Sequence, residues 1–220
     1  MIDFEILATG SAGNAIIIND TILIDCGVPF KTIRDHYKKL KLVLLTHIHG
    51  DHFNKSTIRR LAKERPTLRF GCCQWLVKPL LSAGVDPRNI DVMEPDVAYR
   101  YGAFDIIPVS LVHDVPNCGY KIHFSDSKMF YATDTNNLNG IVAKNYDLYM
   151  VEANYGEEEI RQRIAAKKEA GEYAYEYKVL QNHLSVEKCN DFLYRNMGPK
   201  SEYVYLHQHE GGDWLEGQAD

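Results

Sequence analysis

The chain of 220 residues contains no apolar run that approaches the roughly 20 residues needed to cross a bilayer as a helix. It also lacks an excess of positive charge, because 25 Lys and Arg stand against 30 Asp and Glu, a net charge of -5. Its first five residues are acidic where a secretory signal would be basic. These absences argue against a membrane protein, a secreted protein and a surface built for long-range capture of nucleic acid.

Cysteine is scarce, with five residues and no CxxC spacing; Cys72 and Cys73 are directly adjacent. An odd number of cysteines, with no secretory signal pattern, argues against a disulfide framework. We therefore expect a cytoplasmic protein and no thiolate zinc site. Nucleotide-binding glycine motifs are missing as well. The stretch Gly10–Gly13 has the wrong glycine spacing for a dinucleotide fold, and it is followed by a strand pattern rather than a helix.

The hydrophobic residues, 45% of the chain, are ordinary in number for a soluble globular protein. They form two sets of strand-like runs. Between these sets and after the second, hydrophobic residues recur at helical spacing. Helices are predicted over 30–40 after Pro29, between Asn54 and Pro66, over 74–83, around 157–168, and from 186 to 193. The pattern predicts one α/β domain over residues 1–220, with two sheets sandwiched between helices.

Nine histidines are present, and three of them lie in one short segment, Leu44–His52. Here a buried strand run ends and four potential ligands follow: His47, His49, Asp51 and His52. The first two project from the same side of an extended chain, and the second two can face a neighbouring ion. Imidazole and carboxylate ligands suit borderline cations such as Zn²⁺. An exposed polar loop is the alternative, but packing these groups together without metal would be costly.

This segment resembles the HxHxDH signature of the metallo-β-lactamase fold hydrolases. The resemblance implies an αββα sandwich of two mixed sheets flanked by helices, with a binuclear metal site. It also implies three later ligands at strand ends: His113 on the first ion, Asp134 as the carboxylate shared by both ions, and His207 on the second ion. His209 lies two residues further on and stays open as a rival to His207.

More of the chain resembles the YycJ/WalJ-type single-domain group of this fold and, more distantly, the tRNA-processing enzyme RNase Z. The matching stretches are 9–14, 23–27, 151–154 and 182–185. The resemblance implies that Asn14 and Asp25 support the metal ligands and that His183 lies beside a scissile phosphate. Each has a plainer alternative, as a turn residue or as the neighbour of a helix cap. Asn182 replaces the glycine of the family pattern, and the ending after His207 departs from it.

These residues lead to an expected chemistry. Two divalent ions, Zn²⁺ or alternatively Mn²⁺, would supply a bridging hydroxide at neutral pH. Asp51 would act as ligand and orient the nucleophile, and His183 would stabilise charge on phosphate. We expect a phosphodiesterase or nuclease, exonuclease-like, with DNA or RNA as its partner and no membrane; whether it forms a homo-oligomer stays open. The alternatives are an ester, thioester or lactam hydrolase, and a non-catalytic metal-containing module that binds nucleic acid. The mixed charge of Glu157–Lys178 argues against a basic tRNA-gripping arm.

Overall fold

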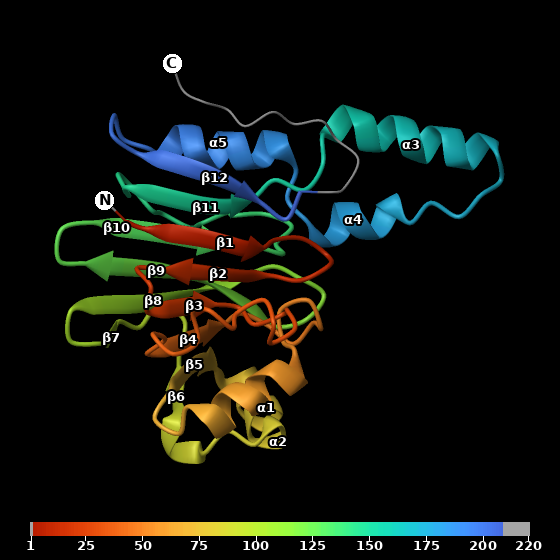
Figure 1. Cartoon of the computed structure of the whole chain (residues 1–220). Helices are drawn as coiled ribbons and strands as arrows, with labels where there is room; N and C mark the ends of the chain where they lie inside the picture. The colour runs from red at the N-terminus through yellow and green to blue at the C-terminus, as the bar shows by residue number, and fades with distance from the viewer. Residues whose placement is uncertain (1, 209–220) are drawn as a thin grey trace.

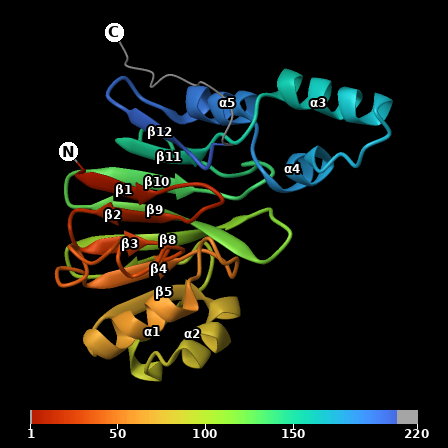
Figure 2. The ribbon, with the colours of Figure 1, turned by 45° about the vertical axis from the view of Figure 1, so that its right-hand side comes forward.

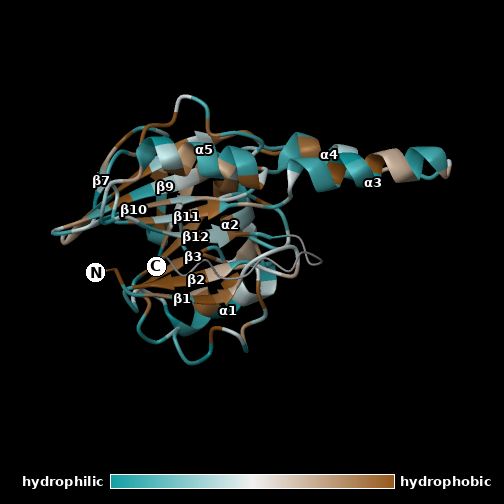
Figure 3. Ribbon diagram, turned by 90° about the horizontal axis from the view of Figure 1, so that it is seen from above, coloured by the Kyte–Doolittle hydropathy of each residue, from teal (hydrophilic) through white to brown (hydrophobic). Residues whose placement is uncertain are grey.

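The computed structural model describes residues 2–208, and two six-stranded sheets pack face to face within them (Figures 1 and 3). The strands of the first sheet are, in order, β1 (Phe4–Ala8), β2 (Ala15–Ile18), β3 (Ile22–Ile24), β4 (Leu42–Leu45), β5 (Arg69–Cys73) and β6 (Ile90–Met93). Those of the second are β7 (Tyr99–Arg100), β8 (Phe104–Leu111), β9 (Asn117–Phe124), β10 (Lys128–Ala132), β11 (Leu148–Glu152) and β12 (Glu202–Leu206).

Both sheets are mixed. In the first, β1 to β3 pair antiparallel and β3 to β6 pair parallel. In the second, β7 to β10 are antiparallel and β10 to β12 are parallel. The predicted sandwich of two mixed sheets with helices outside is confirmed.

The helices cover the two outer faces of this sandwich. Helices α1 (Lys55–Glu64) and α2 (Val77–Ala83) lie against the first sheet, and α5 (Val186–Asn196) lies against the second (Figures 1 and 3). Helices α3 (Glu157–Glu169) and α4 (Glu176–Asn182) project from the body instead (Figure 2). Short 3₁₀ turns occupy Gln74–Leu76 and Pro87–Asn89. No helix in the described part of the chain is long and apolar enough to span a bilayer.

Alternation along β4 shows how the sequence builds these layers. Leu42 and Leu44 point into the layer between the sheets, together with Ile122 of the second sheet. Val43 and Leu45 point the other way, toward the layer beneath α1 and α2. Because all four side chains are almost fully buried, the strand reads as one continuous apolar run. A third apolar layer lies between the second sheet and α5.

The predicted helix over residues 30–40 is wrong. The chain makes successive turns there, and amide groups bond carbonyls three residues back, as from Ile33 N to Phe30 O at 3.2 Å. Phe30, Ile33 and Leu40 are nevertheless buried. Spacings of three and four residues bury the same apolar stripe in tight turns as in an α-helix. The β-branched pair Thr32 and Ile33 also favours α-helix only weakly.

Candidate metal centre

Loops that follow four strands bring the predicted ligands to one edge of the sandwich. The loop after β4 carries His47, His49, Asp51 and His52, and the loops after β8, β10 and β12 carry His113, Asp134 and His207. Their side chains form two groups whose nitrogen and oxygen atoms lie within 4.8 Å of one another. We call His47, His49 and His113 the His47 group, and Asp51, His52 and His207 the His52 group; Asp134 belongs to both.

Asp134 lies at the centre of the cluster. Its Oδ2 is 3.3 Å from His47 Nε2 and 3.0 Å from His52 Nε2, and its Oδ1 is 2.9 Å from His207 Nδ1. Burial opposes the charged carboxylate, but the surrounding imidazoles, His52 foremost, hold the pKa of Asp134 well below its ordinary value. One negative group is therefore shared by ring nitrogens from both groups.

The donor atoms present fit divalent cations. His47 Nε2 and His207 Nε2 are buried, and neither has a hydrogen-bond partner within residues 2–208. Buried polar atoms are normally satisfied, and although His47 Nε2 lies 3.3 Å from Asp134 Oδ2, two ring nitrogens without a well-formed hydrogen bond fit a site that a cation would complete. Imidazole and carboxylate are ligands that zinc and related ions accept. No cysteine joins these groups in the described residues.

His52 is hydrogen-bonded to Asp25, the residue that the sequence analysis expected to support a ligand. Asp25 is fully buried, and its Oδ2 lies 2.7 Å from His52 Nδ1. It also accepts hydrogen bonds from the main-chain N and the hydroxyl of Thr46. Burial alone would lower the pKa of His52, but Asp134 and Asp25 raise it well above its ordinary value. With Asp25 accepting from Nδ1–H, Nε2 is the nitrogen that faces Asp134, and a bound cation would take the place of its proton.

Asn14 lies on the other edge of the His52 ring, beside Nε2. Its Nδ2 is 2.8 Å from His52 Nε2, 3.0 Å from Gly10 O and 3.2 Å from Asp51 O. The amide therefore ties the loop at 10–14 to the loop that follows β4. Nearby, a Cβ on Gly27 would lie only 1.6 Å from Asp51 O, so glycine alone allows the two segments to pass this closely.

Three of these polar residues have left-handed backbones at or just beyond a strand end. The φ angles are 59° at Asp25, 53° at Asp134 and 50° at His207. Such values are uncommon outside glycine, and for His207 the conformation costs about 1–2 kcal/mol. The sharp turn lets the side chain leave the strand direction and point into the cluster. Local sequence gives no signal for it.

Glu152, at the end of β11, had no assigned role in the sequence, yet it connects two histidines. Its Oε1 is 2.6 Å from His183 Nδ1 and 3.1 Å from His207 Nδ1, while Oε2 accepts from the main-chain N of Thr135 and Leu184. Burial disfavours the charged carboxylate, but both histidines lower the pKa of Glu152. Burial likewise opposes a charged His183, but Glu152 raises the pKa of that histidine. The sequence pattern that could have pointed to Glu152 is a buried strand that ends in a carboxylate.

The His47 group has weaker partners. His113 Nδ1 lies 3.0 Å from the carbonyl oxygen of Asn182, and the ring of His49 is about one-third exposed. Asp114, which the sequence did not single out, places Oδ1 3.2 Å from His113 Nε2 and 3.4 Å from His49 Nε2. Burial lowers the pKa of His47 and of His113. The rival ligand His209 lies outside the described residues.

Helices α3 and α4 form an arm that begins beside the cluster, between Glu152 and His183 (Figures 1 and 2). A small apolar cluster of Tyr155, Ile160 and Val179 holds its base together. Internal ion pairs such as Lys167 with Glu176, at 2.6 Å, balance its charge. The sequence did not predict that this segment projects. It remains mixed in sign rather than basic.

A family model described as a β-lactamase superfamily domain matches residues 20–189. Among solved structures, the chain is similar to the metallo-β-lactamase fold protein YhfI from Bacillus subtilis, with TM-score 0.73 and 15% identity over 96% of this chain and 88% of that one. It is also similar to the short form of human tRNase Z, with TM-score 0.69 and 15% identity over 96% and 93% of the two chains.

A third similar structure is zinc-bound PqqB from Methylobacterium extorquens, with TM-score 0.65 and 11% identity over 95% of this chain and 89% of that one. No curated protein matches the sequence. At these identities the solved structures establish the fold alone, whereas the family model covers well over half of the chain. The chain therefore belongs to the β-lactamase superfamily domain family and has the metallo-β-lactamase fold.

Proposed function

We propose that the protein is a hydrolase with two divalent metal ions, Zn²⁺ in the first instance, that cleaves phosphodiester bonds in DNA or RNA. The observation that carries this proposal is Asp134, a single carboxylate shared by two groups of imidazole and carboxylate ligands. Two ions bridged in this way are the arrangement used for phosphoryl transfer. The His47 group with Asp134 would hold one ion, and the His52 group with Asp134 would hold the other.

When bound, the two ions would supply a nucleophilic water at neutral pH and positive charge opposite the phosphate oxygens. The protein's own groups then have separate tasks. Asp51, intermediate in exposure, belongs to the His52 group and lies at the edge where a substrate would enter. Its carboxylate is proposed to orient the attacking water by accepting one of its protons in a hydrogen bond.

His183 is proposed to stabilise the phosphate and to carry a proton to the leaving oxygen. Its Nδ1–H donates to Glu152 Oε1 at 2.6 Å, which fixes the ring and favours its charged form. Within the described residues, the hydrogen bonds of this ring involve Nδ1 alone. Nε2 is therefore free to hold the proton that a leaving alkoxide needs.

Phosphodiesters rank first because the human relative of this fold is, by its name, a tRNase. The arm of α3 and α4 is mixed in sign rather than basic, so we do not extend the proposal to tRNA. The competing proposal is hydrolysis of an ester, thioester or lactam by the same groups, and a non-catalytic metal-containing module is the proposal of another class.

A substrate panel tests the proposal. The purified zinc-loaded and manganese-loaded proteins would be assayed with single-stranded DNA, RNA, a chromogenic phosphodiester, a thioester and nitrocefin. We expect hydrolysis of phosphodiesters that is lost in the variants His49→Ala and Asp51→Ala. Activity on the thioester or nitrocefin with silence on every phosphodiester would reverse the ranking. Absence of any turnover with one tightly held ion would favour the binding module.

A further inference from the structure

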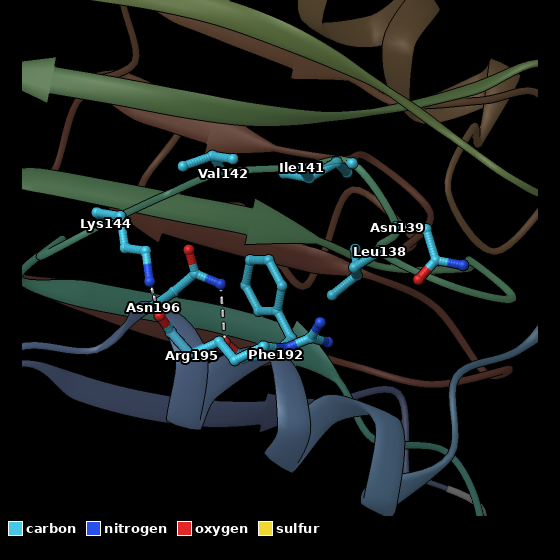
Figure 4. Close-up of a pocket in the computed structure, with 9 residues that line it drawn as sticks. Leu138, Asn139, Ile141, Val142, Lys144, Phe192, Arg195 and Asn196 are labelled. Atoms are coloured by element: carbon cyan, nitrogen blue, oxygen red, sulfur yellow. Dashed lines mark hydrogen bonds between the residues drawn. The ribbon is translucent and has the colours of Figure 1, made fainter.

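A groove runs along α5, on the outer face of the second sheet. Two adjoining cavities of about 270 and 260 Å³ lie between this helix and the segment 136–144. They share Leu138, Asn139, Phe192 and Arg195, so they form one continuous depression. Figure 4 shows Phe192 and Leu138 pointing toward each other across it, with Arg195 beside them.

Three cationic side chains line this groove. Lys188 and Arg195 come from α5, and Lys144 comes from the facing segment. Asp191 is the single carboxylate among the lining residues. The groove therefore carries a local positive excess on a chain whose net charge is -5.

These cations are not neutralised by carboxylates within residues 2–208. Lys188 Nζ donates to Asn136 O at 3.2 Å, and Lys144 Nζ donates to the carbonyl of Arg195. Arg195 Nε donates to the carbonyl of Asp191 at 2.9 Å. Because these partners are neutral main-chain oxygens, the positive charge of all three side chains remains available to an anion.

One end of the groove is linked to the candidate metal centre through Asn136. This residue lines the groove and follows Asp134 by two residues. The Asn136 side chain donates to Gln181 O at 2.9 Å, and the next residue, Asn182, places its carbonyl oxygen against His113. From there Lys188 and Arg195 lie seven residues apart on α5, about 10 Å along the helix axis.

We propose that this groove binds the continuation of a single-stranded nucleic acid whose scissile phosphate lies at the metal centre. The inference rests on the proposed function and adds a second binding surface to it. Cations spaced along the groove match successive phosphates, and the exposed Val142 on its wall offers apolar contact to a sugar or base. A single small anion would contact one of these cations, whereas a nucleic-acid strand would contact several of them along the groove.

The test compares a groove variant with a matched control. The groove variant is Lys188→Gln with Arg195→Gln. The control is Arg59→Gln with Lys63→Gln, which removes the same charges from exposed positions of α1 on the opposite outer face. Both proteins and the wild type would be assayed on a long single-stranded oligonucleotide and on a dinucleotide, with binding followed by fluorescence anisotropy across a salt series.

We expect the groove variant to raise KM for the long oligonucleotide by about tenfold or more while its KM for the dinucleotide stays unchanged. The slope of log affinity against log salt should become shallower by about 0.7 for each lost phosphate contact, and the control should match the wild type. An equal effect on the dinucleotide, an equal effect in the control, or no effect on the long strand would overturn the inference.

Two further outcomes separate this inference from the proposed function. If no phosphodiester is hydrolysed by the wild type, the proposed function fails, but anisotropy with the oligonucleotide still tests the groove. If hydrolysis occurs and binding of the long strand is unaffected in the groove variant, the groove fails and the function stands. Competition by inorganic polyphosphate as effective as that by the oligonucleotide would overturn the assignment to a nucleic-acid strand.

Discussion

The two halves of the candidate metal cluster both contain histidines and give them opposite electrostatic surroundings. In the His47 group, burial lowers the pKa of His47 and His113. In the His52 group, burial also disfavours the charged imidazoles, but nearby carboxylates outweigh it. Asp134 and Asp25 act on His52, and Asp134 and Glu152 act on His207. The pKa of His52 lies well above its ordinary value, and that of His207 rises to about 10.

The partners of the rings explain this difference. His52 and His207 hydrogen-bond to buried carboxylates, whereas His113 contacts a main-chain oxygen and His47 Nδ1 lies 3.0 Å from a Thr46 hydroxyl. A carboxylate behind an imidazole fixes the ring and strengthens it as a ligand. We infer that, with two ions bound, the His52 group would retain its ion more strongly and the His47 group, with the part-exposed His49, would exchange its ion more readily.

The largest expected effect comes from removing the residue that both halves share. Asp134→Asn keeps the size of the side chain but removes the negative charge that His47, His52 and His207 surround. We expect both ions to be lost and hydrolysis to fall to background. Metal content per chain, measured by inductively coupled plasma mass spectrometry, checks this. Retention of two ions would show that Asp134 is not the bridge.

Asp25→Ala should break the His52 group alone. It leaves His52 buried without its carboxylate and leaves Thr46 without its acceptor. Removing one partner of a buried charged pair costs about 3–5 kcal/mol, so the free energy of unfolding of the metal-free protein should fall by that amount. We also expect one ion to remain. Urea unfolding followed by circular dichroism, with metal analysis, provides the measurement, and an unchanged unfolding midpoint would contradict this role.

His49→Ala is the matched change in the other half. The ring is about one-third exposed, so the free energy of unfolding of the metal-free protein should change by no more than about 0.5 kcal/mol. One ion, that of the His47 group, should nevertheless be lost. Equal destabilisation by His49→Ala and Asp25→Ala would remove the contrast between the two halves.

His183→Gln should leave both halves intact and lower the rate. The side chain is in neither the His47 group nor the His52 group, although it lies with Asp134, Glu152 and His207 in a third cluster of possible ligands, where its Nδ1 contacts Glu152. We expect two ions, a lower free energy of unfolding because the buried Glu152 loses its charged partner, and a fall in kcat of about 10²- to 10⁴-fold, as for loss of a general acid. A substrate with a good leaving group, which needs no proton, should lose far less. The same loss on both kinds of substrate would argue against proton donation by His183.

The two halves also differ in how far the sequence could predict them. Four predicted ligands lie within six residues after β4, so local spacing alone indicated that they face one place. His113, Asp134 and His207 come from distant loops and were expected only through the family resemblance. All seven lie together in the structure, although their roles as ligands stay predictions.

Other features were beyond the sequence for physical reasons. The contact between Glu152 and His183 spans 31 residues, and no local spacing encodes it. The arm of α3 and α4 follows from packing of Tyr155, Ile160 and Val179 rather than from a periodic pattern. The apolar stripe at 30–40 was predicted to be buried, but its turns could not be distinguished from a helix.

The most direct measurement of the central claim is a metal titration of the metal-free protein with phosphodiester turnover recorded at each equivalent. The account predicts that two ions bind per chain, the first more tightly, and that turnover of a single-stranded oligonucleotide appears as the second ion binds. Saturation at one ion per chain, or two ions with no phosphodiester cleaved, would contradict it.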